Sequence, residues 1–436
     1  MGLVITIICA LAAAVGGFLF GYDSGVISET LVQETFISKF NLSSSQEGGI
    51  VSVFAAGAFF GAAMAGWLAD RYGRVRTIFI GAVICTNGCA LQASGQNFVM
   101  ILFGRLIAGF SIGQLSMIVP MYQAEISPPK HRGFLSGLQQ QMIGLGFIAS
   151  NWVGYGSAHV KGSAFQWRFP LAVQCCFSIM LIVFTFFLPE SPRYLVKMNR
   201  GDEAKQVLRR LHYDGKNDDW INLEYSEISH QIQSERLVQV SLKDLLLQKT
   251  YRPYLALGCL TQIFSQCTGI NVINYYGPIM YKILGYTGHK IFLLQSIYGV
   301  VGPIANFFFI TCIIDRFGRK RPLIYGSLGL ATVLLIECIV NTKYEPRDGV
   351  ATNKNAQSTG LAMIWLATKS RYYLLFVVLN VVSATTVFLF FPETKGKTLE
   401  EMDKLFTDQA APPTRENPPQ SIEKLSIEYL KDIGKE

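Results

Sequence analysis

Charged residues are scarce in this sequence: Asp, Glu, Lys and Arg together make up 16% of its 436 residues. A soluble chain of this length would carry about 25%. Hydrophobic residues make up 50%, the mean hydropathy is +0.31, and the apolar residues fall in runs of 17 or more. Such runs cross a bilayer as helices, and the alternation in ~10-residue segments that marks a membrane barrel is not visible. The sequence therefore predicts an all-α polytopic membrane protein.

Cysteine and histidine offer no recognisable site. All nine cysteines fall within apolar segments, which is typical of core residues rather than of a disulfide or zinc framework. None of the five histidines lies in the middle of a span, which disfavours a histidine proton relay or a haem site. No nucleophile–base pair, metal-ligand set or phosphate loop is evident. We therefore expect no metal, no cofactor and no enzymatic activity.

Ten apolar segments are long enough to cross a membrane. The first lacks the basic flank of a signal peptide and runs directly into Asp23, so we interpret it as an uncleaved span. The predicted spans are 3–22, 47–69, 77–95, 98–120, 134–156, 167–188, 252–281, 291–314, 323–341 and 372–391.

The net charge of +8 is explained by the loops between these spans. If Asp70 is cytoplasmic, 27 Lys and Arg residues lie on the inner side and seven on the outer side. This asymmetry predicts that both termini are cytoplasmic. It also explains the positive net charge without a nucleic-acid partner. We expect the helices to be surrounded by the lipid bilayer.

The chain contains an internal repeat. The motif DRYGR at 70–74 follows one apolar span, and DRFGR at 315–319 follows another. FLPES at 187–191 and FPET at 391–394 each close a later span. Two related helical bundles in one chain are the plan of many secondary transporters, which bind their substrate between the repeats.

The two repeats differ in length. The interval from Asp70 to Pro189 is 119 residues, whereas the interval from Asp315 to Pro392 is 77, a shortfall of 42. At ~20 residues per span, this corresponds to about two membrane helices with a turn. The apolar stub at 360–367 is too short to span. We therefore expect a truncated second bundle and about ten spans in all.

These features divide the chain into four parts. Residues 1–190 form an N-terminal six-helix bundle, and 191–250 form a cytoplasmic linker of short amphipathic helices near 200–211, 218–236 and 241–249. Residues 251–391 form the truncated C-terminal bundle, and 392–436 form a cytoplasmic tail.

Two ionisable residues fall within the apolar segments. Asp23 ends the first predicted span, and Arg105 lies in the fourth. Such groups are costly at membrane depth and usually pair inside a bundle. A proton on the acid would weaken the pair, which allows proton entry to be coupled to a conformational change. A static ion pair that holds two helices together is the alternative.

Uncharged polar residues interrupt the fifth and seventh spans. Amides and phenols both donate and accept hydrogen bonds, which suits a neutral polyol better than an ion. Hydrogen bonds between helices are the alternative reading. Gly269 and Pro278 predict a broken helix, a common feature of transporter binding sites. The polar residues are Gln139, Gln140, Gln141, Gln262, Ser265, Gln266, Thr268, Asn271, Asn274, Tyr275 and Tyr276.

An ordered set of motifs resembles the sugar porter family of the major facilitator superfamily, and within it the fungal monosaccharide transporters. The motifs are GYD at 21–23, GxxxDRxGR at 66–74, PMYQAEISP at 120–128, RG at 132–133, PESPR at 189–193, GIN at 269–271 and PETKG at 392–396. The resemblance implies a major facilitator fold of two pseudo-repeated helical bundles, alternating access, and a hexose or related polyol as substrate.

The resemblance also implies roles for individual residues. Asp23 and Arg105 match the proton-coupling pair of the symporters. The substrate-binding candidates are Phe20, Gln140, Gln262, Gln266, Asn271 and Tyr275. The cytoplasmic charges that match the gating network are Asp70, Arg74, Glu125, Arg132, Glu190, Arg193, Asp315 and Arg319.

The sequence departs from the family in its second half, where nothing matches the expected tenth and eleventh spans. Three interpretations stay open. The chain is a proton-coupled monosaccharide transporter of the plasma membrane, a sugar sensor or pseudo-transporter that does not transport, or an incomplete gene model of a twelve-span sugar transporter. The sequon at Asn41 lies in the predicted outer loop 24–46, so we expect it to be glycosylated.

Overall fold

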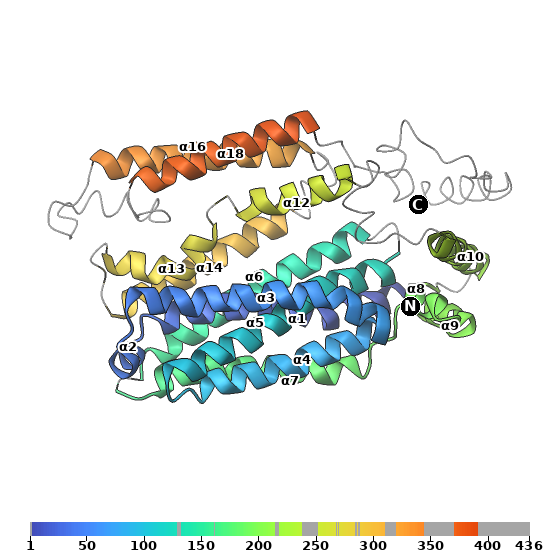
Figure 1. The fold of residues 1–436 in the computed structure, drawn as a ribbon, viewed down its shortest axis with the longest axis horizontal. Coiled ribbons are helices and arrows are strands. Elements are labelled where there is room, and N and C mark those ends of the chain that lie inside the picture. The colour runs from blue at the N-terminus through green and yellow to red at the C-terminus, as the bar shows by residue number, and fades with distance from the viewer. Residues whose placement is uncertain are drawn as a thin grey trace.

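The structure is a computed structural model of the whole chain. It describes residues 2–128, 132–160, 162–213, 218–237, 252–266, 268, 270–283, 286, 288–309, 320–343 and 370–390. All regular elements in these ranges are helices, and most run side by side along the longest axis of the molecule (Figure 1). The tail 392–436 lies outside the described residues.

The first half forms a bundle of six long helices. Six helices of the described part are long and apolar enough to cross a membrane, namely α1, α3, α4, α5, α7 and α14. The bundle consists of α1 (Gly2–Thr30), α3 (Ser44–Tyr72), α4 (Arg74–Ala93), α5 (Phe98–Ile126), α6 (Arg132–Ser157) and α7 (Phe165–Thr185).

Small residues allow these helices to pack closely. A Cβ atom at Gly61 of α3 would overlap the backbone carbonyl of Phe110 on α5. In the same way, a Cβ atom at Gly146 of α6 would overlap the carbonyl of Phe18 on α1. Lipid supplies no hydrophobic drive between helices, so close backbone approach and packing hold such a bundle together.

Helix ends follow the local sequence. The Ser43 side chain accepts from the Gln46 backbone amide, and the Gln46 side chain accepts from the Ser43 amide in return, which makes a capping box at the start of α3. The Asn97 side chain accepts from the Met100 amide at the start of α5. Gly73 lies between α3 and α4 with φ of 95°, a conformation that L side chains rarely adopt.

The first helix is longer than the predicted span 3–22. It continues through Asp23 to Thr30, and a short helix α2 (Glu34–Phe40) follows in the predicted outer loop. The predicted span ends at residue 22 because a charged residue, Asp23, follows the apolar run. The helix continues because that charge is paired inside the bundle, as described below.

The linker contains α8 (Pro192–Lys197), α9 (Gly201–His212) and α10 (Asp218–Leu237). The sequence predicts the last two but not α8, and the helix predicted near 241–249 lies outside the described residues. The linker docks on the first bundle, since the Thr6 hydroxyl of α1 donates to the Leu211 carbonyl at 2.8 Å. One ring nitrogen of His212 lies 2.9 Å from the Ile126 carbonyl at the end of α5.

The second half contributes α12 (Arg252–Gln266), α13 (Ile270–Ile283), α14 (His289–Phe308), α16 (Lys320–Lys343) and α18 (Ser370–Phe390). The predicted span 252–281 is a broken helix, because α12 ends at Gln266 and α13 begins at Ile270. Helices α16 and α18 pack against each other on the far side of α12–α14 from the first bundle (Figure 1).

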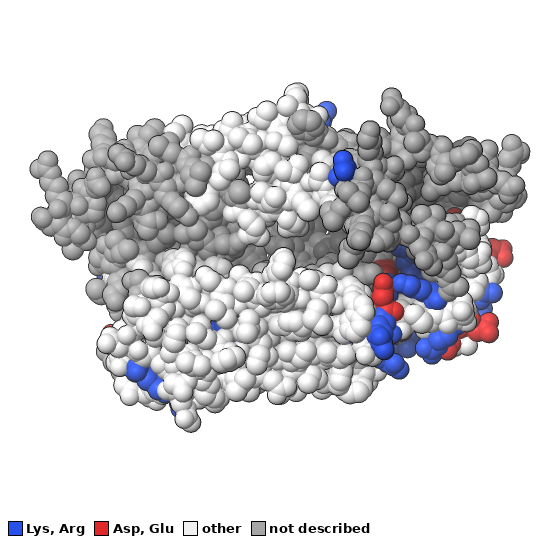
Figure 2. All heavy atoms as spheres, in the orientation of Figure 1, with Lys and Arg blue, Asp and Glu red and all other residues white. Residues whose placement is uncertain are grey.

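Charged side chains are distributed unevenly over the surface. On the face drawn in Figure 2, most described Lys, Arg, Asp and Glu residues gather at the end of the molecule where α8, α9 and α10 lie. The flank of the helical bundle between the two ends is almost free of charge on this face. This pattern fits a chain that crosses a membrane with its linker helices at one surface.

Candidate functional site

Asp23 and Arg105 form an ion pair in the centre of the first bundle. An Arg105 guanidinium nitrogen donates to a carboxylate oxygen of Asp23 at 2.6 Å, and neither side chain has exposed surface. The other Asp23 oxygen accepts from the Gln174 amide of α7 at 2.9 Å. The guanidinium also lies over the Phe54 ring, 4.4 Å from its centroid. Three helices thus converge on one carboxylate, and sequence reasoning missed Gln174.

The broken helix of the second half reaches this pair. Tyr275 of α13 packs against the apolar cluster of the first bundle that contains Tyr22 and Val26 of α1. Its side chain lies close to that of Ser24, the residue after Asp23. A predicted substrate residue of one half therefore lies beside the predicted proton site of the other.

A second polar contact between the halves runs along α6 and α14. The Gln141 side chain donates to the Pro303 carbonyl at 3.3 Å and accepts from the Asn306 amide at 3.0 Å. The Asn151 amide donates to the Gln295 carbonyl at 3.3 Å. The Gln141–Asn306 contact was not predicted, because the family resemblance points to the neighbouring Gln140.

The remaining substrate candidates lie apart from one another. Phe20 of α1 is half-buried against the core of the first bundle. Gln140 of α6 has an exposed side chain, as do Gln262 and Gln266 of α12. The side chain of Asn271 lies outside the described residues. The structure thus brings Tyr275 close to the residue next to Asp23 and leaves amides of both halves exposed.

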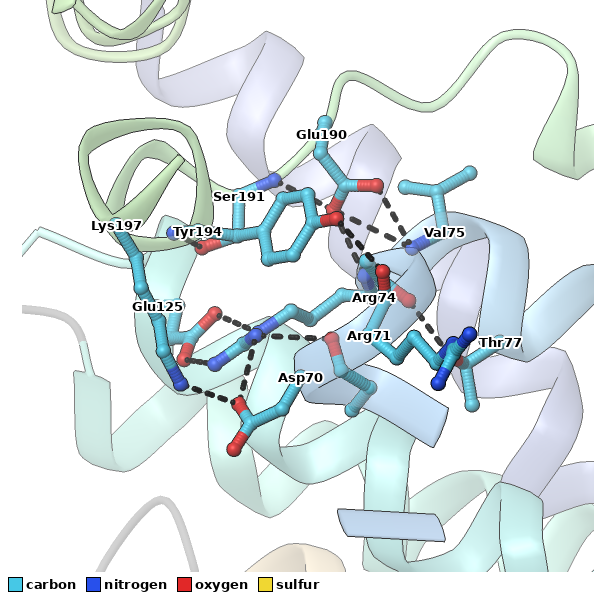
Figure 3. A network of polar contacts seen from close by, with 12 residues as sticks. Asp70, Arg71, Arg74, Val75, Thr77, Glu125, Glu190, Ser191, Tyr194 and Lys197 are labelled. Atoms are coloured by element: carbon cyan, nitrogen blue, oxygen red, sulfur yellow. Dashed lines mark hydrogen bonds and ion pairs between the residues drawn. The ribbon is translucent and has the colours of Figure 1, made fainter. Parts of the chain in front are cut away.

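The predicted gating charges of the first half form a connected network (Figure 3). Two guanidinium nitrogens of Arg74 donate to the two carboxylate oxygens of Glu125, each at 2.9 Å. The third guanidinium nitrogen of Arg74 lies 3.5 Å from a carboxylate oxygen of Asp70. The same oxygen forms an ion pair with the Lys197 ammonium group at 3.0 Å. Arg74 and Glu125 are nearly buried, whereas Asp70 is half exposed. Such bidentate arginine–carboxylate pairs fix the geometry of the elements that carry them.

The side-chain carboxylate of Glu190 binds backbone amides at the start of α4. One carboxylate oxygen accepts from the Arg74 amide at 2.9 Å and lies 3.4 Å from the Val75 amide. A Cβ atom at Gly73 would lie 2.5 Å from the other oxygen, so only glycine fits there. Burial raises the pKa of Glu190, against the opposing effect of these amides and of the Arg74 charge.

The rest of the predicted network is differently placed or not described. The Arg193 guanidinium donates to the Gln231 side chain of α10 at 2.5 Å, so it ties two linker helices together. The side chain of Arg132 lies outside the described residues, as do Asp315 and Arg319.

Asn41 lies in the connection between α2 and α3. It caps α2 in the left-handed conformation with φ of 43°, and its side chain is exposed. Its glycosylation stays a prediction.

Two membrane-embedded helical sets, which meet beside a buried acid–arginine pair of the first bundle, define a secondary transporter of the major facilitator type. The sequence profile described as "Sugar (and other) transporter" matches residues 9–367 and 358–406. The chain belongs to this family of multi-pass membrane transporters. The two matched segments meet at 358–367, where the sequence predicts that a helix pair is missing.

Two fungal relatives align along most of the chain. The MFS-type transporter criB of Aspergillus cristatus is 38% identical over 446 positions, which cover 94% of this chain and 95% of that protein. This alignment has more positions than the 436 residues of the chain, so the relative carries segments that the chain lacks. The high-affinity glucose transporter of Kluyveromyces lactis is 28% identical, and the alignment covers 91% of this chain and 84% of that protein.

The fold is similar to that of the proton:xylose symporter XylE. XylE bound to 6-bromo-6-deoxy-D-glucose superposes with a TM-score of 0.78 at 26% identity, covering 93% of this chain and 99% of XylE. The inward-open conformation of XylE from E. coli gives 0.66 at 25% identity, covering 91% and 98%. The conformation described here is therefore more similar to the sugar-bound form than to the inward-open form.

Proposed function

We propose that the chain carries a monosaccharide, a hexose or a related polyol, across the plasma membrane by alternating access, and that protons drive the transport. The observation that carries this proposal is the contact of Tyr275 with Ser24, next to the Asp23–Arg105 pair. Because Ser24 is next to Asp23 in the chain, a sugar hydroxyl that binds Tyr275 would lie close to the titratable carboxyl group of Asp23. Relatives named as a glucose transporter and a proton:xylose symporter support the same substrate class.

The proposed substrate site lies between the two halves. Phe20 and Gln140 would form its wall on the first bundle, and Gln262, Gln266, Asn271 and Tyr275 its wall on the broken helix. Hydroxyl groups of a sugar both donate and accept, as do these amides and the phenol. Asp23 would take up the proton, and its loss of charge would release Arg105 and loosen the contact between α1, α5 and α7.

The cytoplasmic charges would hold the inner side closed. In this proposal the members are Asp70, Arg74, Glu125, Arg132, Glu190, Arg193, Asp315 and Arg319. The described pairs join α3, α4, α5 and the linker, so separating these elements would break buried hydrogen bonds to charged groups. If this network is cytoplasmic, both termini would lie inside and Asn41 would lie outside.

The proposal is tested by uptake of labelled hexoses, pentoses and inositol into cells that lack their own sugar transporters. Cells expressing the chain should show saturable uptake of at least one monosaccharide, and cells with Tyr275→Ala should show much less at equal surface expression. No saturable uptake of any of these compounds at verified surface expression would contradict the proposal. An endoglycosidase-sensitive mass shift that Asn41→Gln removes would support the proposed orientation.

A further inference from the structure

A second buried carboxyl group lies on the same helix as Asp23. Glu29 is in the last turn of α1, which ends at Thr30. Its side chain is only 1% exposed. Both of its carboxyl oxygens lack a hydrogen-bond partner among the described residues. None of the mechanism proposed above uses this residue.

Glu29 is enclosed between α1 and α6. A Cβ atom at Gly154 of α6 would overlap the Glu29 carboxyl group, so the carboxyl occupies the space that glycine leaves. One turn earlier on α6, Asn151 is fully buried, and its side-chain amide oxygen also lacks a partner within the described part of the chain. The acid therefore faces the helix that contacts α14 of the second half through Asn151.

The cations on neighbouring elements are bound elsewhere. Arg105 of α5 is paired with Asp23, and Arg74 of α4 is paired with Glu125. Arg168 of α7 lies over the Trp167 ring, and its guanidinium donates to the Gly95 carbonyl at 3.4 Å.

The other titratable groups that face this region are uncharged phenols or lie at a distance along the helix. Tyr22 of α1 donates its hydroxyl to the Pro170 carbonyl at 2.9 Å, and Tyr275 of α13 lies close to Ser24. The basic helix α9 meets α1 at Thr6, near the opposite end of α1 from Glu29. His159, which follows α6, is exposed and stacks on His289. No described cation compensates a charge on Glu29.

A carboxylate in this position would be disfavoured for two reasons. An ionised group that is buried without donors or a counter-ion carries the full cost of its lost hydration. The C-terminal end of a helix also bears partial negative charge, which repels an anion in the last turn. The opposite holds for Asp23, which an arginine and an amide stabilise as a carboxylate. The two acids of α1 are therefore built for opposite protonation states.

We propose that Glu29 is a second proton-binding residue of the transport cycle and that it, rather than Asp23, carries the proton in the conformation described here. This inference rests on the proposed proton-coupled transport. The proton is held as the O–H of the neutral Glu29 carboxyl group and leaves when water reaches that group at another stage of the cycle. Asp23 accepts a proton at a different stage, when its pair with Arg105 opens.

The protonation state is measured without reference to transport. Purified wild-type protein in lipid vesicles is treated at neutral pH with a hydrophobic carbodiimide, which reacts with protonated carboxyl groups in apolar surroundings, and the peptides are analysed by mass spectrometry. We expect an adduct on Glu29 and none on Asp23. In infrared difference spectra over a pH titration, the Glu29→Gln variant should lose one protonated-carboxyl band that the wild type shows. Glu34→Gln, which changes an exposed acid of α2, should keep that band.

The role in coupling is measured with the same proteins. Glu29→Gln preserves the neutral, isosteric side chain, so sugar exchange without a gradient should be retained. Its proton-to-sugar ratio or its pH dependence should differ from that of wild type and of Glu34→Gln. An unreactive Glu29 with no band lost in Glu29→Gln would overturn the inference. Unchanged coupling in Glu29→Gln would overturn the role in transport. If wild type moves sugar without protons, the proposed proton coupling fails, and the carbodiimide and infrared results still decide whether Glu29 holds a proton.

Discussion

The Arg105 guanidinium and the Asp23 carboxylate lie 2.6 Å apart with no exposed surface on either side chain, and Tyr275 of the other half reaches the residue next to Asp23. Removing one partner of a buried pair leaves an uncompensated charge, whereas neutralising the acid by protonation does so reversibly. This relationship makes Asp23 the point where proton binding can change the contact between the two halves.

Asp23→Asn should abolish proton-driven accumulation of sugar and spare exchange down a gradient, because only the titratable group is lost. The measurement is uptake into membrane vesicles with and without an imposed pH gradient. Glu34→Gln is a suitable comparison, since it removes an exposed acid of α2 outside the bundle centre. Accumulation by Asp23→Asn equal to that of wild type would reject the coupling role.

Glu125→Gln should destabilise the described conformation by up to ~3 kcal/mol, because nearly buried Arg74 would lose its bidentate carboxylate partner. We expect a lower thermal midpoint in detergent and a shift toward the inward-open state, measured by labelling of cysteines placed on the inner side.

The matched control for this network is Glu203→Gln. Glu203 pairs with Arg200 on the linker surface, where both side chains are about half exposed, so solvent screens the pair. The thermal midpoint should not change measurably in this variant. Equal effects of Glu125→Gln and Glu203→Gln would show that the buried network is not a latch.

Glu190 predicts a pH-dependent stability. Burial raises its pKa in the folded state, so its contribution to stability is fully present below the unfolded-state pKa. That contribution is lost as the pH rises through the folded-state pKa. Glu190→Gln cannot titrate, so the difference in thermal midpoint between wild type and this variant should shrink as the pH rises from acidic to neutral. A difference that grows over this range would contradict the raised pKa.

Much of this arrangement follows from sequence patterns, because apolar runs and turn motifs report directly on helices and their ends. The break between Gln266 and Ile270 belongs to this predictable part, and so does the presence of Arg74 and Glu125 in one charge network. The length of α1 was underestimated, since a charge ends a span only if it has no partner inside the bundle. The partner of Asp23 is Arg105 of α5, and this pairing depends on how α5 packs against α1.

Contacts that depend on helix rotation could not be predicted. Three consecutive glutamines occupy three different faces of α6, so the sequence cannot tell which one meets Asn306. The structure selects Gln141. Glu29 was also missed, because an acid near a predicted helix end reads as a loop residue until Gly154 of α6 is seen to enclose it.

Because the sequence predicts that a helix pair is missing, we expect slow transport. Polar side chains of α12 such as Gln266 would face lipid if neighbouring helices are absent, and a binding cavity would lack part of its wall. Inserting a helix pair between Ala367 and Tyr372 should therefore increase the rate of labelled-hexose uptake at least tenfold at equal surface protein. Equal rates for the two versions would show that the pair is dispensable.

The most direct measurement of the central claim is the simultaneous recording of sugar and proton movement in vesicles that contain the purified 436-residue chain. With acid outside, labelled hexose should accumulate inside together with an inward flow of protons, and a protonophore should abolish the accumulation. Vesicles in which the folded protein moves neither hexose nor protons above the level of protein-free vesicles would contradict the account.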